Sequence, residues 1–342
     1  MPTLTGLRLE RAQASKQFRN GRFWNSSSGG PPPIDANSFK LAADLLFGGK
    51  KRRPHALLPV ENPLATWATP VSSGLRVTWF GHSTLLLESN NVRVLIDPIF
   101  GDYASPGFFA GRKRFHPVPA TIEQLPPLDA VLLSHDHYDH LNTPSIRKLG
   151  KLRVPFITSL GVGVRLEKLG VDPKLITELD WWEEHTLPGD TMSFTATPAQ
   201  HFSGRGLRDR NVTLWSSWVI ATPNKKIFYS GDTGLTDDLA TIGQRFAPFD
   251  LSLIEIGASN PAWADIHLGP VNAMRAFEML GSGTFLPIHW GTFDLALHRW
   301  DEPAETLVTL AEKTGARVLT PILGRPIEPE LVEYTPRWWR DL

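Results

Sequence analysis

The sequence contains no cysteine. This absence excludes disulfides and thiolate ligands, so a metal ion bound by the chain would need nitrogen and oxygen ligands. It is also compatible with a reducing compartment. The first fifteen residues lack the continuous apolar stretch of a signal peptide, and no segment approaches the roughly 18 apolar residues of a membrane-spanning helix. We therefore expect a soluble, cytoplasmic protein, and peripheral contact with a membrane stays open.

An excess of charge of either sign is absent as well. The 342 residues include 35 Lys and Arg and 35 Asp and Glu, so the formal net charge is zero. No overall field then attracts a polyanion, and a nucleic acid is not favoured as a partner. One dense basic run, at residues 50–53, is interpreted as a solvated loop, with a phosphate or membrane-surface contact as the alternative. The composition, 41% hydrophobic and 20% charged, is that of an ordinary globular protein.

Residues 1–74 differ from the rest of the chain. Residues 26–33 read Ser-Ser-Ser-Gly-Gly-Pro-Pro-Pro, which is typical of a loop, and four prolines interrupt the segment from 54 to 70. We interpret residues 1–74 as an irregular N-terminal arm packed on the main domain. Residues 75–342 would form that domain.

From residue 75 onward, short β-branched and aliphatic runs predict two series of strands. The first series covers 75–80, 84–89, 92–98, 130–134 and 155–159, and its first three members predict an antiparallel meander. The second series covers 191–199, 213–222, 226–232, 251–256, 283–290 and 317–323. Helical patterns cover 143–151, 161–170, 235–246, 271–280 and 304–313. This order predicts an α/β (α+β) fold in which two sheets stack face to face, with helices outside and loops from both halves at one edge.

Polar residues follow the apolar strand at 130–134. They form an HxHxDH motif, made by His135, His137, Asp139 and His140. Side chains at i and i+2 of an extended segment share a face, so His135 and His137 can bind one cation together. Asp139 and His140 lie beyond a turn and can approach a second cation. Imidazole and carboxylate ligands suit zinc, and also manganese or iron.

Three further candidate ligands stand at the ends of other apolar strands. His201 follows strand 191–199, Asp232 ends 226–232, and His289 lies near the end of 283–290. A single histidine in such a place is more often a hydrogen-bonded core residue. Their recurrence beside an HxHxDH motif favours a metal site that is built along one edge of a sheet.

The pattern resembles the metallo-β-lactamase fold superfamily over residues 70–330. The resemblance implies a four-layer αββα sandwich that binds two divalent metal ions at one edge. It implies that His135, His137 and His201 hold one ion, and that Asp139, His140 and His289 hold the other. Asp232 would bridge the two ions. Asp97 matches an early aspartate of the superfamily that orients the ligands; the alternative for Asp97 is a turn residue before proline.

Other segments resemble the N-acyl-phosphatidylethanolamine-hydrolysing phospholipase D family. These are residues 22–25, 78–84, 97–100, 201–205, 265–270 and 288–293. The resemblance implies a phosphodiesterase that attacks N-acyl-phosphatidylethanolamine-like lipids through a hydroxide bridging the two metal ions. The alternatives are a lactonase or other small-metabolite ester hydrolase of the ascorbate-6-phosphate lactonase-like branch, and a non-catalytic metal-binding protein.

Several residues are candidates for roles beyond metal binding. Asp139 would help to orient the nucleophile, and His267 would contact the phosphate or assist the leaving group; the alternative for His267 is a helix-entry residue bonded to backbone. His82 would support the ligands or meet the substrate. Arg205 would pair with a phosphate or lie exposed in a loop. The expected partner is a phospholipid or another small phosphodiester substrate. The sequence leaves the oligomeric state open, and a homodimer is one of the alternatives.

The aromatic residues carry two further expectations. We expect the side chains of Phe100, Tyr103, Phe108 and Phe109 to line the mouth of the site and meet acyl chains, or else to close over the N-terminal arm. Most of the twelve tryptophans should be core residues. In the adjacent pairs 181–182 and 338–339, an extended backbone would place one ring inward and one on the surface.

Overall fold

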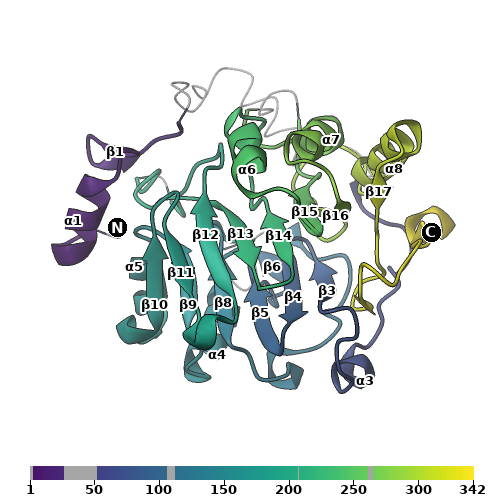
Figure 1. Ribbon diagram of the computed structural model, residues 1–342, viewed down its shortest axis with the longest axis horizontal. Helices are drawn as coiled ribbons and strands as arrows, with labels where there is room; N and C mark the ends of the chain where they lie inside the picture. Colours follow the sequence, from purple (N-terminus) through teal and green to yellow (C-terminus); the bar gives the residue numbers. More distant parts are fainter. Residues whose placement is uncertain (1–2, 27–51, 106–111, 207, 261–264) are drawn as a thin grey trace.

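The structure, a computed structural model, describes residues 3–26, 52–105, 112–206, 208–260 and 265–342. In these residues two large sheets, each of seven strands, stack face to face (Figure 1). The first sheet has, in spatial order, β10 (Ile176–Leu179), β9 (Phe156–Ser159), β8 (Ala130–Leu133), β5 (Val92–Ile96), β4 (Thr84–Ser89), β3 (Arg76–Gly81) and β18 (Pro326–Ile327). The second has β11 (Glu184–Thr186), β12 (Ser193–Thr197), β13 (Ser217–Ala221), β14 (Lys226–Tyr229), β15 (Leu251–Glu255), β16 (Thr284–Ile288) and β17 (Arg317–Val318).

Strand direction brings the functional loops to one edge. In the first sheet β3, β4 and β5 form the predicted antiparallel meander, and β8 then runs parallel to β5. In the second sheet β14, β15 and β16 are parallel, and β12 runs the same way because β13 is antiparallel to both β12 and β14. The carboxyl ends of β12, β14, β15 and β16 therefore lie along the same edge.

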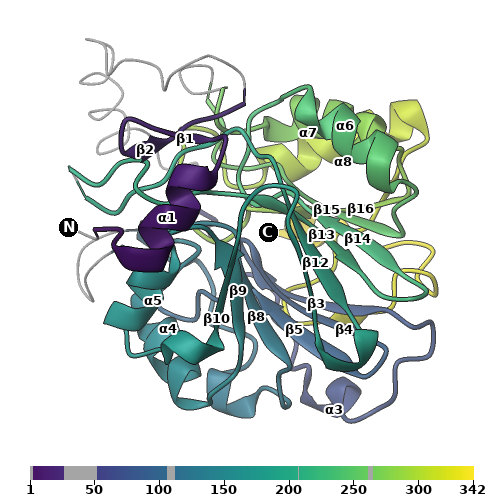
Figure 2. The ribbon, with the colours of Figure 1, turned by 60° about the vertical axis from the view of Figure 1, so that its left-hand side comes forward.

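Helices cover the outer face of each sheet (Figure 2). Outside the first sheet lie α4 (Thr143–Lys151) and α5 (Gly163–Lys168), whose Ile146 and Leu166 pack with Phe156 of β9. Outside the second sheet lie α6 (Asp238–Phe246), α7 (Gly269–Met279) and α8 (Glu302–Thr314). Apolar side chains of both sheets fill the space between them in one large core cluster. The predicted αββα sandwich is confirmed.

The N-terminal segment has regular structure that the sequence analysis did not predict. It contains α1 (Gly6–Ala14), which lies beside α5 and β10, and a hairpin of β1 (Phe18–Arg19) and β2 (Arg22–Phe23), which lies above α1 in Figure 2. Phe23 packs in a core cluster with Trp181 and Trp215 of the main domain. The remaining short elements are α3 (Leu64–Trp67) and the pair β6 (Tyr103–Ala104) and β7 (Arg112–Lys113).

The tryptophans are mostly core residues, as expected, but the expectation for one adjacent pair is wrong. Trp338 and Trp339 are both buried, and each packs within about 5.5 Å of the Trp290 ring. Their segment is a 3₁₀ turn and not an extended strand, so neighbouring side chains do not alternate between core and solvent. The pair at 181–182 follows the expectation more closely, with Trp181 buried and Trp182 partly exposed.

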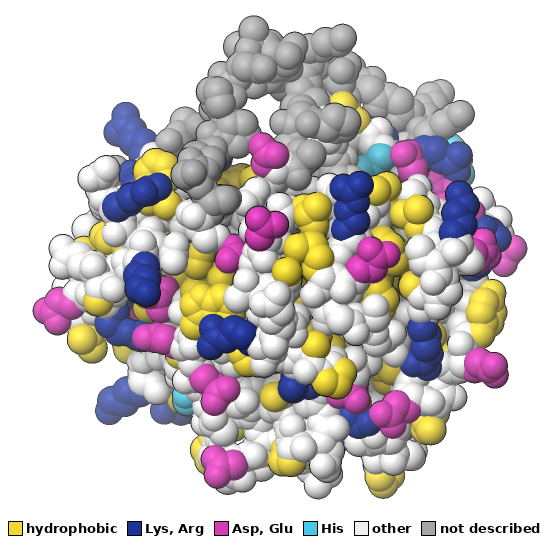
Figure 3. Space-filling view, turned by 45° about the horizontal axis from the view of Figure 1, so that its top comes forward, with side chains coloured by type: hydrophobic (Ala, Val, Ile, Leu, Met, Phe, Trp, Pro, Cys, Tyr) yellow, Lys and Arg dark blue, Asp and Glu magenta, His cyan; other side chains and the backbone are white. Residues whose placement is uncertain are grey.

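The molecular surface agrees with the neutral composition. On the face in Figure 3, basic and acidic side chains are interspersed and neither sign dominates. Within the described ranges, no helix has the length and apolar character to cross a bilayer.

A buried ion pair joins β3 to β4. Arg76 Nε and Nη2 donate to the two carboxylate oxygens of Glu88 at 2.6 and 2.8 Å, and both side chains are almost fully buried. Removal of one partner leaves a buried charge without compensation, which typically costs about 3–5 kcal/mol.

We therefore expect Glu88→Gln to lower the free energy of unfolding by several kcal/mol, on the order of that range, as measured by urea denaturation. Glu123→Gln is the matched control, because Glu123 pairs with Lys148 on the exposed surface. An equal shift of the two unfolding midpoints would contradict this interpretation.

Candidate metal centre

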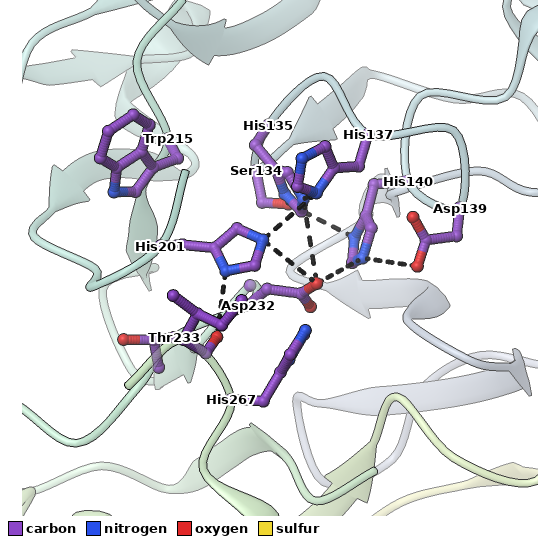
Figure 4. A network of polar contacts seen from close by, with 12 residues as sticks. Ser134, His135, His137, Asp139, His140, His201, Trp215, Asp232, Thr233 and His267 are labelled. Atoms are coloured by element: carbon purple, nitrogen blue, oxygen red, sulfur yellow. Dashed lines mark hydrogen bonds and ion pairs between the residues drawn. The ribbon is translucent and has the colours of Figure 1, made fainter. Parts of the chain in front are cut away.

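All seven candidate ligands meet at the edge where the strands end. The loop after β8 carries His135, His137, Asp139 and His140, which face His201 and Asp232 from the second sheet (Figure 4). His289, which follows β16, completes the set. The local backbone is tightly turned there, since Asp97 and His289 adopt positive φ angles of 37° and 62°. Such conformations are uncommon outside glycine and are found at functional sites.

One group of ligand atoms surrounds His137. His137 Nδ1 lies 2.9 Å from His135 Nε2 and 3.2 Å from His201 Nε2. Asp232 Oδ2 lies 3.8 Å from the same nitrogens of His135 and His201. Imidazole nitrogens this close, with no other polar group between them, are well placed to share a cation.

A second group of ligand atoms lies around the same oxygen, Oδ2 of Asp232. His140 Nε2 and His289 Nε2 each lie 3.2 Å from Asp232 Oδ2. Asp139 Oδ2 lies 3.4 Å from His289 Nε2 and 3.0 Å from His82 Nε2. The sequence left open whether His82 supports the ligands or meets the substrate, and the structure shows it in contact with a candidate ligand.

The chemistry of these atoms fits divalent cations. Two groups of four residues each offer ligand atoms that all lie within 4.8 Å of one another inside the group. One group is His135, His137, His201 and Asp232, and the other is His82, Asp139, His140 and His289. Among the described residues, His140 Nε2, His289 Nε2 and Asp232 Oδ1 are buried without a hydrogen-bond partner. Buried polar atoms almost always have partners, so these atoms converge on a space that suits a metal ion.

The electrostatics of the cluster follow from burial and mutual contact. Burial lowers the pKa of His135 well below its ordinary value, and the neighbouring His140 and His137 lower it further. Burial opposes the ionisation of Asp232, yet His140 and His289 hold the pKa of Asp232 well below the usual range. Burial would also lower the pKa of His289, but Asp232 above all raises that pKa to about 10. A cation bound here would take the place of that proton.

Asp97 fixes one ligand from behind. Its carboxylate accepts hydrogen bonds from Ser134 N at 2.8 Å, from His140 Nδ1 at 2.6 Å and from Tyr229 Oη at 2.5 Å. With Nδ1 engaged in this way, the Nε2 atom of His140 faces the cluster. Asp97 is therefore placed as the resemblance implied, and is more than a turn residue before proline.

His267 is held by an acidic residue that sequence reasoning missed. His267 Nδ1 lies 2.7 Å from Glu255 Oε2, so its partner is a carboxylate and not the backbone. Burial would lower the pKa of His267, but the Glu255 carboxylate raises it. Glu255 is fully buried at the end of β15 and also accepts from Thr233 N at 2.8 Å. A single charged residue within the apolar run LSLIEI was the signal that could have found it.

Arg205 is held by the protein itself and does not lie exposed in a loop. Its guanidinium donates to the carbonyls of Asp136 and Leu141 at 2.8 and 2.7 Å, and it stacks on the Tyr138 ring at 3.7 Å. These contacts clamp the loop of the HxHxDH motif at both ends. Arg205 is thus engaged by the protein itself and is not an exposed loop residue, and its pairing with a phosphate stays a prediction.

The N-terminal segment reaches the centre through Asn25. Its side-chain amide donates to His201 O at 3.0 Å and accepts from His201 N at 3.1 Å. Trp215 Nε1 also donates to Asn25 Oδ1, at 3.1 Å. The backbone of one candidate ligand is therefore fixed by a residue almost 180 positions earlier in the chain.

A cavity of about 290 Å³ opens beside the cluster. Its walls combine His137, Asp139, His201, Asp232, His267 and His289 with the apolar side chains of Phe202, Ala258, Ile266 and Leu295. The expectation that Phe100 lines this mouth is wrong, because Phe100 packs against Phe80 in the core. Phe108 and Phe109 lie outside the described residues.

The interpretation of the basic run as a solvated loop is also wrong in part. Arg52 is buried and lies 3.6 Å from Asp294, which Arg53 approaches to 3.4 Å. The loop at this point therefore packs on the protein. Lys50 and Lys51 lie outside the described residues.

Comparison with known proteins agrees with this geometry. Residues 92–290 match the family model of the β-lactamase superfamily domain. An uncharacterised protein of Mycobacterium tuberculosis is 41% identical over 334 residues, which cover 96% of this chain and 88% of that protein. N-acyl-phosphatidylethanolamine-hydrolyzing phospholipase D 1 of Caenorhabditis elegans is 33% identical over 338 residues, which cover 91% of this chain and 93% of that protein.

A solved structure shares the fold. The isothiocyanate hydrolase from Delia radicum gut bacteria superposes with a TM-score of 0.59 at 23% identity, covering 74% of this chain and 98% of that one. The family model spans more than half of the chain, and the nematode enzyme aligns over nearly all of it. The chain is therefore a metallo-hydrolase of the β-lactamase superfamily and belongs, within it, to the family of the N-acyl-phosphatidylethanolamine-hydrolysing phospholipases D.

Proposed function

We propose that this protein is a phosphodiesterase of the phospholipase D type that hydrolyses N-acyl-phosphatidylethanolamine-like lipids at a two-metal centre. The observation that carries the proposal is the likeness to the nematode phospholipase D along 91% of the chain. The convergence of seven nitrogen and oxygen ligands beside a partly apolar cavity supports it.

The ligands divide into two sets around Asp232. His135, His137 and His201 would hold one divalent ion, and Asp139, His140 and His289 the other. The contacts of Asp232 Oδ2 with histidines of both sets support a bridging role for this carboxylate. Zinc suits these ligands best, and manganese or iron are compatible with them. When bound, two divalent ions supply a water nucleophile at neutral pH and offset the charge on the phosphoryl oxygens.

The residues of the cavity walls support a proposal for the remaining roles. The oxygen of water would add to phosphorus while the water gives up one proton to solvent or to a base of the site. The bond from phosphorus to the leaving oxygen would break, and that oxygen would take up one proton from an acid of the site. Asp139 is partly exposed to the cavity and can orient the attacking water. His267 also lines the cavity, and because Glu255 engages its Nδ1, Nε2 is the ring nitrogen left to donate to the leaving oxygen. Phe202, Ile266 and Leu295 offer apolar contact to an acyl chain.

The first prediction concerns metal content. We expect two divalent ions per chain at saturation, because seven ligands exceed the four of one tetrahedral ion. Asp232→Asn should lose metal and lower turnover by roughly 100-fold or more, since even outer partners of a ligand contribute 10–100-fold. Elemental analysis and a hydrolysis assay measure both.

Asp190→Asn is the control, because Asp190 is exposed and remote from the centre. One ion per saturated chain would exclude the two-metal centre. A wild-type rate for Asp232→Asn at saturating metal would exclude the bridging role.

The second prediction isolates His267. His267→Gln should lower kcat by about 100-fold or more, the usual contribution of a positioned proton donor, while two ions remain bound. Steady-state kinetics with parallel metal analysis test it. A good leaving group needs no proton. The variant should therefore lose much less activity on a nitrophenyl phosphodiester than on the lipid. Equal losses on both substrates would contradict the role of proton donor.

The third prediction concerns substrate class. Release of phosphatidic acid from N-acyl-phosphatidylethanolamine should exceed hydrolysis of a short-chain diester, of a sugar lactone and of a β-lactam. Burial of one large apolar group contributes about 1.5–3 kcal/mol, or about ten- to a hundredfold in binding. Leu295→Ser should therefore reduce lipid turnover more than turnover of the short-chain diester. Faster hydrolysis of the lactone would replace the proposal with a lactonase.

A further inference from the structure

Within the described residues, four arginines of the β1–β2 hairpin and of the loop after Phe202 lack a carboxylate partner. Arg19 and Arg22 face each other across the β1–β2 hairpin, and Arg22 Nη2 donates to the carbonyl of Arg208 at 3.1 Å. Arg210 follows two residues later in the same loop. We call these four residues the arginine surface. In the described part of the chain, none of them lies within ion-pair distance of an acidic side chain, although most other arginines do.

The one carboxylate in this loop points inward. Asp209 is buried, pairs with Arg165 at 2.7 Å, and accepts from the backbone of Gly206 at 2.8 Å. It therefore neutralises an internal arginine and does not face Arg208 or Arg210. No carboxylate of the described residues therefore pairs with the arginine surface, in a chain whose net charge is zero.

Two of the arginines lie on aromatic rings. The guanidinium carbon of Arg19 lies 4.7 Å from the Trp24 ring centroid, and that of Arg210 lies 4.4 Å from the Phe202 ring centroid. A stacked guanidinium is held in place by its face and keeps its edge free for two hydrogen bonds to a phosphate. A guanidinium held in this way is well placed to bind a phosphate group.

Phe202 connects this surface to the metal centre. Its ring lines the cavity and lies 4.6 Å from the ring of His137. Arg210 and His137 therefore contact the same aromatic ring. Phosphate groups bound by these arginines would therefore lie next to the mouth of the cavity.

We propose that the arginine surface docks the mouth of the metal cavity onto an anionic phospholipid surface. This inference rests on the proposed function, because a lipid substrate must be reached within its bilayer. The arginines are exposed or half-exposed and spread over a hairpin and a separate loop. Such a spread matches many head-group phosphates in a plane, whereas one soluble phosphate would need the side chains to converge.

The test is binding to vesicles, which needs no turnover. The full-length, metal-loaded protein is sedimented with vesicles of phosphatidylcholine, or of phosphatidylcholine and phosphatidylglycerol in equal amounts. The variants are Arg19→Gln with Arg22→Gln, and Arg208→Gln with Arg210→Gln. Arg147→Gln with Arg275→Gln is the matched control, because it removes the same charge from exposed positions on α4 and α7.

We expect binding to the anionic vesicles alone. Each arginine near an anionic surface contributes about fivefold in affinity, so each double variant should bind about 25-fold more weakly, and the control should bind like the wild type. Metal content and melting temperature, unchanged in every variant, would show that the fold is intact. Binding by a protein that cleaves no lipid would still support the surface and would contradict only the proposed function.

Three results would overturn the inference. One is equal binding of the wild-type protein to both kinds of vesicle, or to neither. Another is a loss in the control variant as large as in the other two. The third is displacement from the vesicles by inorganic phosphate more readily than by chloride at the same ionic strength, which would identify a site for soluble phosphate.

Discussion

A buried carboxylate surrounded by imidazoles is the interaction on which the rest of the structure depends. Asp232 is fully enclosed, and one of its oxygens faces nitrogens of His135, His140, His201 and His289. Taking a carboxylate out of water costs several kcal/mol unless positive charge compensates it. Within the protein that compensation comes from histidines of both halves of the sandwich, and bound cations would complete it. The two sheets are therefore joined by electrostatics as well as by their apolar core.

A frame of hydrogen bonds holds the ligands in this arrangement. Asp97 orients His140, Asn25 fixes the backbone of His201, and Arg205 clamps the loop of the HxHxDH motif. These residues come from an early strand end, from the N-terminal segment and from the loop after β12. The frame holds together imidazoles whose pKa values are lowered by one another's proximity, as the pKa of His135, already lowered by burial, is lowered further by His140 and His137. It makes the N-terminal segment part of the centre and not an appendage.

The cavity explains how one centre can serve a lipid. Its polar wall is made of candidate ligands and His267, and its other wall of Phe202, Ala258, Ile266 and Leu295. Phe202 also supports Arg210, so apolar contact, metal ligation and surface charge meet around one ring. A substrate with a phosphodiester and acyl chains presents the matching groups in the same order. The proposed catalytic and docking functions would then share a single aromatic side chain.

The sequence by itself determined the fold class, the family and the set of polar residues at the strand ends. It did so because apolar strands and the loops after them leave local patterns that need no knowledge of distant contacts. The helix at 143–151 was predicted to the residue, and the structure shows a sharply defined start, where Asn142 caps the helix and Pro144 is its second residue. The short strands β10, β11 and β18 were missed, because so few residues carry no periodic signal of their own.

Only the tertiary structure decided how those residues combine. Glu255 became the partner of His267, and Arg205 came to hold the loop of the HxHxDH motif. Phe100 packs, partly buried, against a core cluster, and Trp338 and Trp339 are both buried. Each of these outcomes depends on a neighbour far away in the chain. A local pattern states which groups are polar or apolar, whereas burial and hydrogen-bond partners follow from the packing of segments that the sequence separates.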